Sequence, residues 1–232
     1  MKHPELYSNF YKKDKLGFDL TLVKKGFEKF KNHFNGFNCL ELGPSYGYMT
    51  SELVKVFQNV VAVEGSETLF NAIPNFNNLE KHNSLFEDFS TDEKFDTIIL
   101  NHVLEHIENP VSLLKKIKTW MSPGGVLIIG VPNAKSFHRL AAVKMGLLNS
   151  EYELNERDHQ LGHYRVYDFD SLIKDSSEAG LIVNYRGGLF IKFLSNSQIQ
   201  EFLSQEIIES YFDLGDQFIE NCAEIYIVLK ND

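Results

Sequence analysis

The residues best suited to chemistry in this chain gather around a glycine-containing turn that follows a short apolar run. Residues 39–50 read CLELGPSYGYMT, in which two glycines follow the acid Glu41. Glycine has no Cβ, so the backbone of such a turn can approach a bound molecule closely. A turn between a strand and a helix also points backbone N–H groups at a ligand beside the carboxyl edge of a sheet. We therefore expect a ligand to contact Glu41, Gly43, Pro44, Ser45 and Gly47.

A second acid, Glu64, ends the next apolar run and indicates that the ligand contains a ribose. It follows Gly43 by roughly twenty residues, and a carboxylate at the tip of a second strand can accept both ribose hydroxyls. The dinucleotide fingerprint G-x-G-x-x-G needs a third glycine, which this turn lacks. An acid near the turn repels a pyrophosphate and suits a cationic ligand that bears an amine and a sulfonium. We expect Glu64, Gly65 and Ser66 to contact this ligand.

A third chemical group follows the apolar run 95–100, where residues 102–106 read HVLEH. This fits the inverted zinc-peptidase motif H-x-x-E-H, in which two histidines on one helix face bind Zn²⁺ beside a glutamate base. Here, however, His102 comes directly after a predicted strand, and Pro110 cuts the segment soon afterwards. A zinc hydrolase built on His102, Glu105 and His106 is therefore a remote alternative, and we expect no metal.

The motifs together resemble those of class I S-adenosylmethionine (SAM) methyltransferases, in particular the ubiquinone-biosynthesis O-methyltransferase-like group (methyltransferase type 11/23). In that family an acid precedes three alternating glycines, and Ser45 replaces the middle one here. The run 102–106, the following Asn109-Pro110 and the turn Pro123-Gly124-Gly125 fall in the order that the group shows. The resemblance covers about residues 37–190. It implies SAM as cofactor and a Rossmann-like, doubly wound α/β fold.

The resemblance also implies further cofactor contacts. Asn101 and His102 would border the cofactor, and Leu85 and Phe86 would cover its adenine, since the segment after the third strand holds the adenine in this class. An N-terminal arm with a tyrosine often closes over the cofactor in related enzymes, so Tyr11 is a candidate, although it could also be a packing aromatic. Glu105 and His106 either face the substrate or brace their turn.

Residues 134–165 are predicted to form a lid that supplies the acceptor site and a general base. A connection of this length is usually a functional insertion, and it leaves the sheet at the edge where the cofactor binds. His163 is the first candidate base, because Gly162 lets the backbone approach the site; His159 is the second and His106 the third. Asp158 would orient one of these histidines. The alternative is a helical insertion that packs on a neighbouring subunit.

The elements that must position these groups follow from the apolar runs. Strands are predicted at 37–42, 59–64, 79–83, 95–101, 126–133, 181–186 and 223–229, and helices at 46–57, 66–73, 111–120 and 169–179. This is a mostly parallel seven-stranded sheet with an antiparallel last strand. We expect a single domain over residues 1–232, with a helical arm at 1–36 and a helical insertion at 195–220 before the last strand.

Composition excludes several function classes. The net charge of −9 and the lack of a basic cluster with interleaved aromatics beyond residue 31 disfavour nucleic acid as a partner. No apolar stretch long enough for a membrane span and no signal-peptide core are present. Two cysteines provide no disulfide framework. These features predict a soluble, cytoplasmic protein that acts on a small molecule, and a homodimer is a candidate assembly.

The predicted function is SAM-dependent methyl transfer to a small-molecule acceptor, at oxygen more than at nitrogen. The Asn/Asp-Pro-Pro-Tyr motif of enzymes that methylate amino groups of bases and glutamine is absent. A hydroxyl of a sugar, a polysaccharide precursor or a similar metabolite is the expected acceptor. The alternative is a non-catalytic SAM-binding sensor or partner protein, whose acceptor pocket would be filled by side chains.

Overall fold

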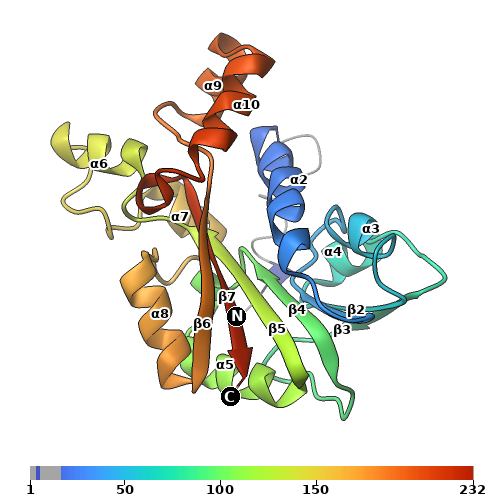
Figure 1. Ribbon diagram of the computed structural model, residues 1–232. Coiled ribbons are helices and arrows are strands. Elements are labelled where there is room, and N and C mark those ends of the chain that lie inside the picture. Colours follow the sequence, from blue (N-terminus) through green and yellow to red (C-terminus); the bar gives the residue numbers. More distant parts are fainter. Residues whose placement is uncertain (1–3, 6–16, 232) are drawn as a thin grey trace.

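One mixed β-sheet forms the centre of the protein (Figure 1). The computed structural model describes residues 4–5 and 17–231, which are the basis of every structural statement below. The strands are β1 (Asn38–Leu42), β2 (Asn59–Glu64), β3 (Leu79–Asn83), β4 (Phe95–Asn101), β5 (Met121–Pro132), β6 (Leu181–Leu189) and β7 (Glu224–Asn231). Their order in the sheet is β3-β2-β1-β4-β5-β7-β6. The first five strands run parallel, and β7 pairs antiparallel with β5 and β6, which confirms the predicted fold class.

Helices cover both faces of this sheet, as a doubly wound fold requires (Figure 1). They are α2 (Phe18–Phe30), α3 (Thr50–Leu53), α4 (Glu67–Ala72), α5 (Pro110–Trp120), α6 (Phe137–Lys144), α7 (Glu156–Leu161), α8 (Phe169–Glu178), α9 (Asn196–Phe202) and α10 (Gln205–Leu214). Helices α5 and α8 pack on one face through a shared apolar cluster that includes Ile117 and Leu172. Helix α2 packs on the other face through Phe27 and Phe30.

The sequence explains why α5 and α8 begin where they do. The Asn109 side chain accepts a hydrogen bond from the Ser112 N–H, and Pro110 occupies the first helical position, which needs no N–H donor. The Asp168 side chain caps α8 by accepting from the Ser171 N–H. Each cap satisfies an N–H group that the helix itself leaves without a partner.

Two elements differ from the prediction, and two long connections contain helices. The helix expected at 46–57 contains only α3, because residues up to 49 form the turns around Gly47 that the glycine motif requires. Strand β5 begins at Met121 rather than Val126, and its register against β4 shifts at this early part. The insertion at 134–165 contains α6 and α7, and the stretch 195–220 contains α9 and α10.

In the described part of the chain, no helix is both long enough and apolar enough to cross a bilayer.

Candidate functional site

A cavity of about 310 Å³ lies where β1, β2 and β4 end. This is the edge at which open α/β sheets bind ligands, because the strand order reverses there. Most of the predicted cofactor residues line it: Glu41, Gly43, Pro44, Ser45, Glu64, Gly65, Ser66, Leu85, Phe86, Asn101 and His102. Gly47 does not line the cavity, and Tyr11 lies outside the described residues.

The glycine turn has a backbone that explains its sequence. Gly43 has a φ of 77°, and a Cβ there would lie 2.5 Å from Cγ2 of Val103, so only glycine fits. Gly47 has a φ of 72°, and its N–H closes the turn by donating to the Pro44 carbonyl at 2.8 Å. Ser45 is also left-handed, with a φ of 52°, at the place where the related motif has its middle glycine. The turn therefore keeps its shape despite this substitution, at a cost on the order of 1 kcal/mol.

Glu64 stabilises the Ser45 conformation and faces the cavity. Its Oε2 accepts from the Ser45 N–H at 3.1 Å and its Oε1 from the Ser66 N–H at 2.9 Å. Burial raises the pKa of this carboxyl, and the backbone hydrogen bonds oppose that rise. An ionised carboxylate has about four acceptor positions. Glu64 therefore keeps acceptor capacity for hydroxyl groups of a ligand.

Glu41 is a second buried carboxyl beside the turn. Its Oε2 accepts from the Thr50 hydroxyl at 2.6 Å. Burial raises the pKa of Glu41 from 4.5 to about 7; the Thr50 bond lowers it and the nearby charge of Glu64 raises it further. Near neutral pH, Glu41 is therefore divided between its protonated and ionised forms, and a cationic ligand would favour the ionised form.

The Glu41→Gln variant should remove a pH-dependent loss of stability. Below about pH 4.5 the Glu41 carboxyl is protonated in both the folded and unfolded states. Its burial therefore does not lower the free energy of unfolding at that pH. Above about pH 7 the charge is buried in the folded state, and the free energy of unfolding of the wild type should be lower by about 3 kcal/mol. Urea unfolding at pH 4.5 and pH 8 measures the difference between wild type and variant.

The half-buried neighbour Glu52 provides the control, because Glu52→Gln removes the same charge from a side chain that is 40% exposed and pairs with Lys55 at the surface. This variant should follow the wild type at both pH values. An equal pH dependence in Glu41→Gln and wild type would show that Glu41 keeps an ordinary pKa.

His102 lies between two acids at the end of β4. Its Nε2 is 3.1 Å from Oε1 of Glu224, and its Nδ1 is 3.5 Å from Oε1 of Glu105. Burial alone would lower the pKa of His102, but the two carboxylates outweigh it and raise this pKa well above its usual range. The two carboxylates therefore favour the protonated, imidazolium form of His102, which is a poor base and a poor metal ligand.

The zinc-peptidase arrangement is consequently not formed. The 3₁₀ turn Leu104–His106 is the only helical part of that segment, and His102 precedes it with a φ of 56°. Its ring faces Glu105 and Glu224 instead of sharing a helix face with His106. The zinc motif needs both histidines on one continuous helix, whereas His102 here lies at the end of a strand.

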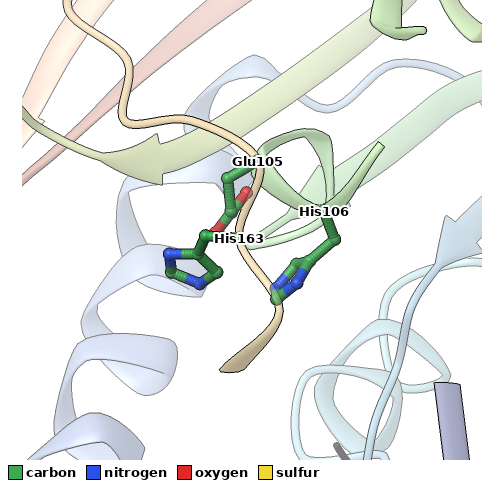
Figure 2. A group of neighbouring side chains, drawn as sticks. All are labelled: Glu105, His106 and His163. Atoms are coloured by element: carbon green, nitrogen blue, oxygen red, sulfur yellow. The ribbon is translucent and has the colours of Figure 1, made fainter. Parts of the chain in front are cut away.

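A different cluster joins the two candidate regions of the sequence. Glu105, His106 and His163 bring donor atoms within 4.8 Å of one another, and Figure 2 shows their three side chains gathered together. The rings of His106 and His163 contact each other directly, edge to face, with centroids 4.6 Å apart. The Tyr164 N–H donates to the Glu105 carbonyl at 2.8 Å, which holds this segment against the turn after β4.

The charge states in this cluster follow from burial and mutual contact. Burial raises the pKa of Glu105, but the histidines around it prevail and bring this pKa down to about 2. Burial lowers the pKa of His106 to about 4, against the attraction of Glu105. At neutral pH the cluster thus contains an ionised Glu105 and a neutral His106.

Asp158 orients His163. Its Oδ1 lies 3.1 Å from Nδ1 of His163, and its Oδ2 accepts from Nη1 of Arg139 at 3.1 Å and from the Asn155 N–H at 2.9 Å. Burial raises the pKa of Asp158, but these partners outweigh it and lower the pKa to about 2. With an ionised Asp158 at Nδ1, the hydrogen-bond network assigns the proton of a neutral ring to Nδ1, so Nε2 is the acceptor.

The three predicted bases have different positions. His163 and His106 line the cavity, whereas His159 is exposed on α7 and does not. The phase of α7 causes this, because its capping box turns Asp158 inward and thereby leaves the next residue outside. Gly162 then ends the helix with a φ of 78° and returns the chain to the cavity at His163.

Comparison with known proteins adds the family. The model of the family described as "Methyltransferase domain" matches residues 17–184, well over half of the chain. The chain belongs to this methyltransferase family.

Relatives and solved structures agree with this membership. The methyltransferase is 27% identical over 215 residues to a ubiquinone biosynthesis O-methyltransferase of Rickettsia bellii, covering 88% of this chain and 81% of that one. Its fold is similar to a SAM-dependent methyltransferase, possible histamine N-methyltransferase, of Thermotoga maritima, with a TM-score of 0.67, 17% identity and 99% of both chains covered. It is also similar to the N-methyltransferase NodS of Bradyrhizobium japonicum in complex with S-adenosylhomocysteine, with a TM-score of 0.58, 14% identity and 90% and 86% of the chains covered. The cofactor of this methyltransferase is SAM.

The residues of the cavity fit this cofactor. Glu64 keeps acceptor capacity for ribose hydroxyls, and Gly43 leaves room beside the backbone. Oδ1 of Asn101 is buried at the end of β4 without a hydrogen-bond partner among the described residues. A buried acceptor without a partner is costly, so a donor group of a bound molecule would stabilise it.

Several residues that line the cavity of the methyltransferase were not predicted from its sequence. Glu224 reaches it because β7 pairs with β5, and an acid at the start of an otherwise apolar last strand is the one signal that could have indicated it. His138 and Arg139 come from α6, and Lys192 and Asn196 from the segment around the start of α9. They meet only through tertiary packing.

Proposed function

We propose that this methyltransferase methylates a hydroxyl group of a small molecule, such as a sugar, a polysaccharide precursor or a similar metabolite, with His163 as general base. The observation that carries the proposal is the Asp158–His163 pair in the cavity wall. Hydroxyl acceptors lose a proton as the new bond forms, and a positioned histidine promotes that loss. The name of the Rickettsia bellii relative, an O-methyltransferase, supports the choice of oxygen.

The residues divide the work of the reaction between them. SAM, when bound, supplies a methyl group activated by its sulfonium. Glu64, Gly43 and Asn101 would hold the cofactor, and the cavity walls would align the acceptor hydroxyl with the methyl group, which alone supplies a large part of the rate. Nε2 of His163 takes the proton of the hydroxyl, and the Asp158 carboxylate stabilises the resulting imidazolium through Nδ1.

The second buried acid supports the same proton transfer. Glu105 is ionised and 1% exposed, and its charge lies close to both His106 and His163. A positive charge that develops on the His163 ring is therefore met by two carboxylates, Asp158 and Glu105. The low dielectric of the site strengthens this attraction.

We also propose that residues 134–165 act as a lid over the acceptor. His138, Arg139, Asn155 and Asp158 of this segment line the cavity together with His163. Gly146 and Gly162 have φ values of 72° and 78° and are candidate hinges near the ends of α6 and α7. The polar side chains that this segment contributes to the open cavity speak against the alternative of a sensor whose acceptor pocket is filled by side chains.

A methyl-transfer assay tests the proposed function. The purified protein is incubated with SAM carrying a labelled methyl group and a panel of sugars, nucleotide sugars and phenols, and labelled products are identified by mass spectrometry. We expect transfer to at least one hydroxyl class, together with binding of S-adenosylhomocysteine and no binding of NAD in calorimetry. Binding of S-adenosylhomocysteine without transfer to any acceptor would support the sensor instead.

Removal of metal ions should leave this activity unchanged. The donor atoms of Glu105, His106 and His163 are close enough together to suggest a cation site, although tetrahedral zinc needs ligand atoms about 3.4 Å apart. The bond from Asp158 to Nδ1 of His163 would suit a metal ligand equally, because it leaves Nε2 open. We assign the cluster to proton transfer on the spacing of its donor atoms, which spread up to 4.8 Å. Dialysis against EDTA should not change turnover, and elemental analysis should find no stoichiometric zinc. Loss of turnover that added Zn²⁺ or Mg²⁺ restores would assign the cluster to a metal instead.

A further inference from the structure

A lysine without an acidic partner lines the acceptor side of the cavity. Nζ of Lys192 donates to Oδ1 of Asn196 at 2.5 Å, and no carboxylate oxygen of the described residues lies within 4.0 Å of it. An ammonium group has three donors, so two remain. Most of this side chain is withdrawn from solvent, and burial lowers the pKa of Lys192 below its usual value. A charge in such surroundings is costly unless an anion pairs with it.

The acids that influence Lys192 are engaged elsewhere. Asp19 accepts from Nη2 of Arg157 at 2.6 Å and from Nδ2 of Asn196 at 2.5 Å. Glu224 contacts His102 at 3.1 Å. The bond from Asn196 to Asp19 also fixes the amide so that its oxygen faces Lys192. Helices α2, α7 and α9 together hold the lysine in place without neutralising it.

His138 adds a neutral donor or acceptor to the same wall. Its Nδ1 is buried and has no hydrogen-bond partner among the described residues. Burial, and then the positive charges of Lys192 and Arg139, lower the pKa of His138 to about 3, so the ring is neutral at physiological pH. A ligand that approaches Lys192 therefore meets a second polar group whose hydrogen bond is unmade.

The charged residues of the cavity come from different elements of the fold. Glu41 and Glu64 are at the cofactor side, where the cationic cofactor would bind. Arg139, Arg157 and Lys192 are contributed by the insertion and by the segment before α9. Arg139 is committed to Asp158 and to the carbonyls of Glu151 and Glu153, and Arg157 is paired with Asp19. Lys192 is the cation of this wall that remains for a ligand.

We propose that Lys192, assisted by His138, binds an anionic group of the methyl acceptor, a carboxylate or a phosphate. This inference rests on the proposed function, because the acceptor is its ligand. The anion at Lys192 and the hydroxyl at His163 fix the acceptor at two points, and such a fixed orientation is what in-line transfer requires. Neutral analogues of the acceptor lack the contact with Lys192 and keep only the contact with His163.

Calorimetry with simple anions tests the inference. Protein saturated with S-adenosylhomocysteine is titrated with inorganic phosphate, benzoate and the neutral benzamide at constant ionic strength. We expect at least one anion to bind more tightly than benzamide, and Lys192→Met to weaken that anion about tenfold or more, the scale of a lost charged hydrogen bond. Lys192→Arg, which keeps the charge, should retain binding.

The variant Lys55→Met is the matched control, because it removes one lysine charge from an exposed position. It should bind the anions as the wild type does. Preference for phosphate over benzoate would indicate a phosphorylated acceptor, and the reverse preference a carboxylate.

Equal affinity of both anions for wild type and Lys192→Met, or anions no tighter than benzamide, would overturn the inference. S-adenosylhomocysteine affinity, measured in the same samples, separates the two levels of argument. If S-adenosylhomocysteine binds normally while the anions fail this test, the acceptor inference falls and the proposed function stands. If the wild type does not bind S-adenosylhomocysteine, the proposed function falls and the inference falls with it.

Discussion

Replacing His163 by alanine should lower kcat about 10²-fold or more and leave the affinity for S-adenosylhomocysteine nearly unchanged. Loss of a general base typically has this effect on the rate. If His163 is the base, its loss should slow the reaction without weakening cofactor binding. Nδ1 of His163 contacts Asp158 and its ring packs on His106, away from the predicted ribose contacts at Glu64. Steady-state kinetics and calorimetry on the same protein preparation measure both quantities.

His159→Ala is the matched control for this variant. It removes an identical side chain four positions away, from an exposed site outside the cavity. This control should turn over at the wild-type rate. Asp158→Asn should also lower kcat, because it removes the carboxylate that stabilises the imidazolium and selects the tautomer. Wild-type turnover in His163→Ala would eliminate His163 and leave His106 as the remaining candidate base.

The opposite positions of His159 and His163 show where sequence reasoning ends. Both histidines are in one titratable cluster, and the sequence favoured His163 only through the adjacent glycine. The structure separates them because the capping box fixes the rotation of α7 and the left-handed Gly162 ends it. Whether His159 faces the cavity or the solvent depends on the capping box that Asn155 and Asp158 form together. Neither residue alone predicts this orientation.

The cofactor side of the cavity was more accessible to prediction than the acceptor side. Gly43, Ser45 and Glu64 follow strands that are adjacent in the sequence and in the sheet, so local patterns place them. Lys192 and Glu224 reach the cavity through the antiparallel return of β7 and the packing of α9, which no local pattern describes. The shortened helix around α3 has the same origin, since the turn that serves a ligand takes residues from the helix.

The charge of His102 is another property that the sequence alone could not supply. A histidine in an H-x-x-E-H run suggests a neutral metal ligand or base. Its contact with Glu224, which is far away in the chain, favours its imidazolium form and links the ends of β4 and β7. This tertiary contact therefore disfavours both roles that the motif suggests for His102.

The second large effect is expected at Glu64, where alanine should weaken binding of S-adenosylhomocysteine by about 1–3 kcal/mol, or roughly 5- to 150-fold. The variant leaves the ribose hydroxyls without their acceptor and also strands the N–H groups of Ser45 and Ser66. Glu64→Gln is not a mild change here. Since both oxygens accept from backbone N–H groups, the amide NH₂ of glutamine would face one of these donors.

The exposed neighbour Glu67 tests whether the loss is specific to the cavity. Glu67→Ala removes the same charge from the start of α4, outside the cavity lining. This variant should bind S-adenosylhomocysteine like the wild type, whereas Glu64→Ala should not, and thermal unfolding should show that both variants are folded. Because the Ser45 turn depends on Glu64, the Glu64 variants should lose affinity for both SAM and S-adenosylhomocysteine. Unchanged affinity in a folded Glu64→Ala protein would show that the ribose lies elsewhere.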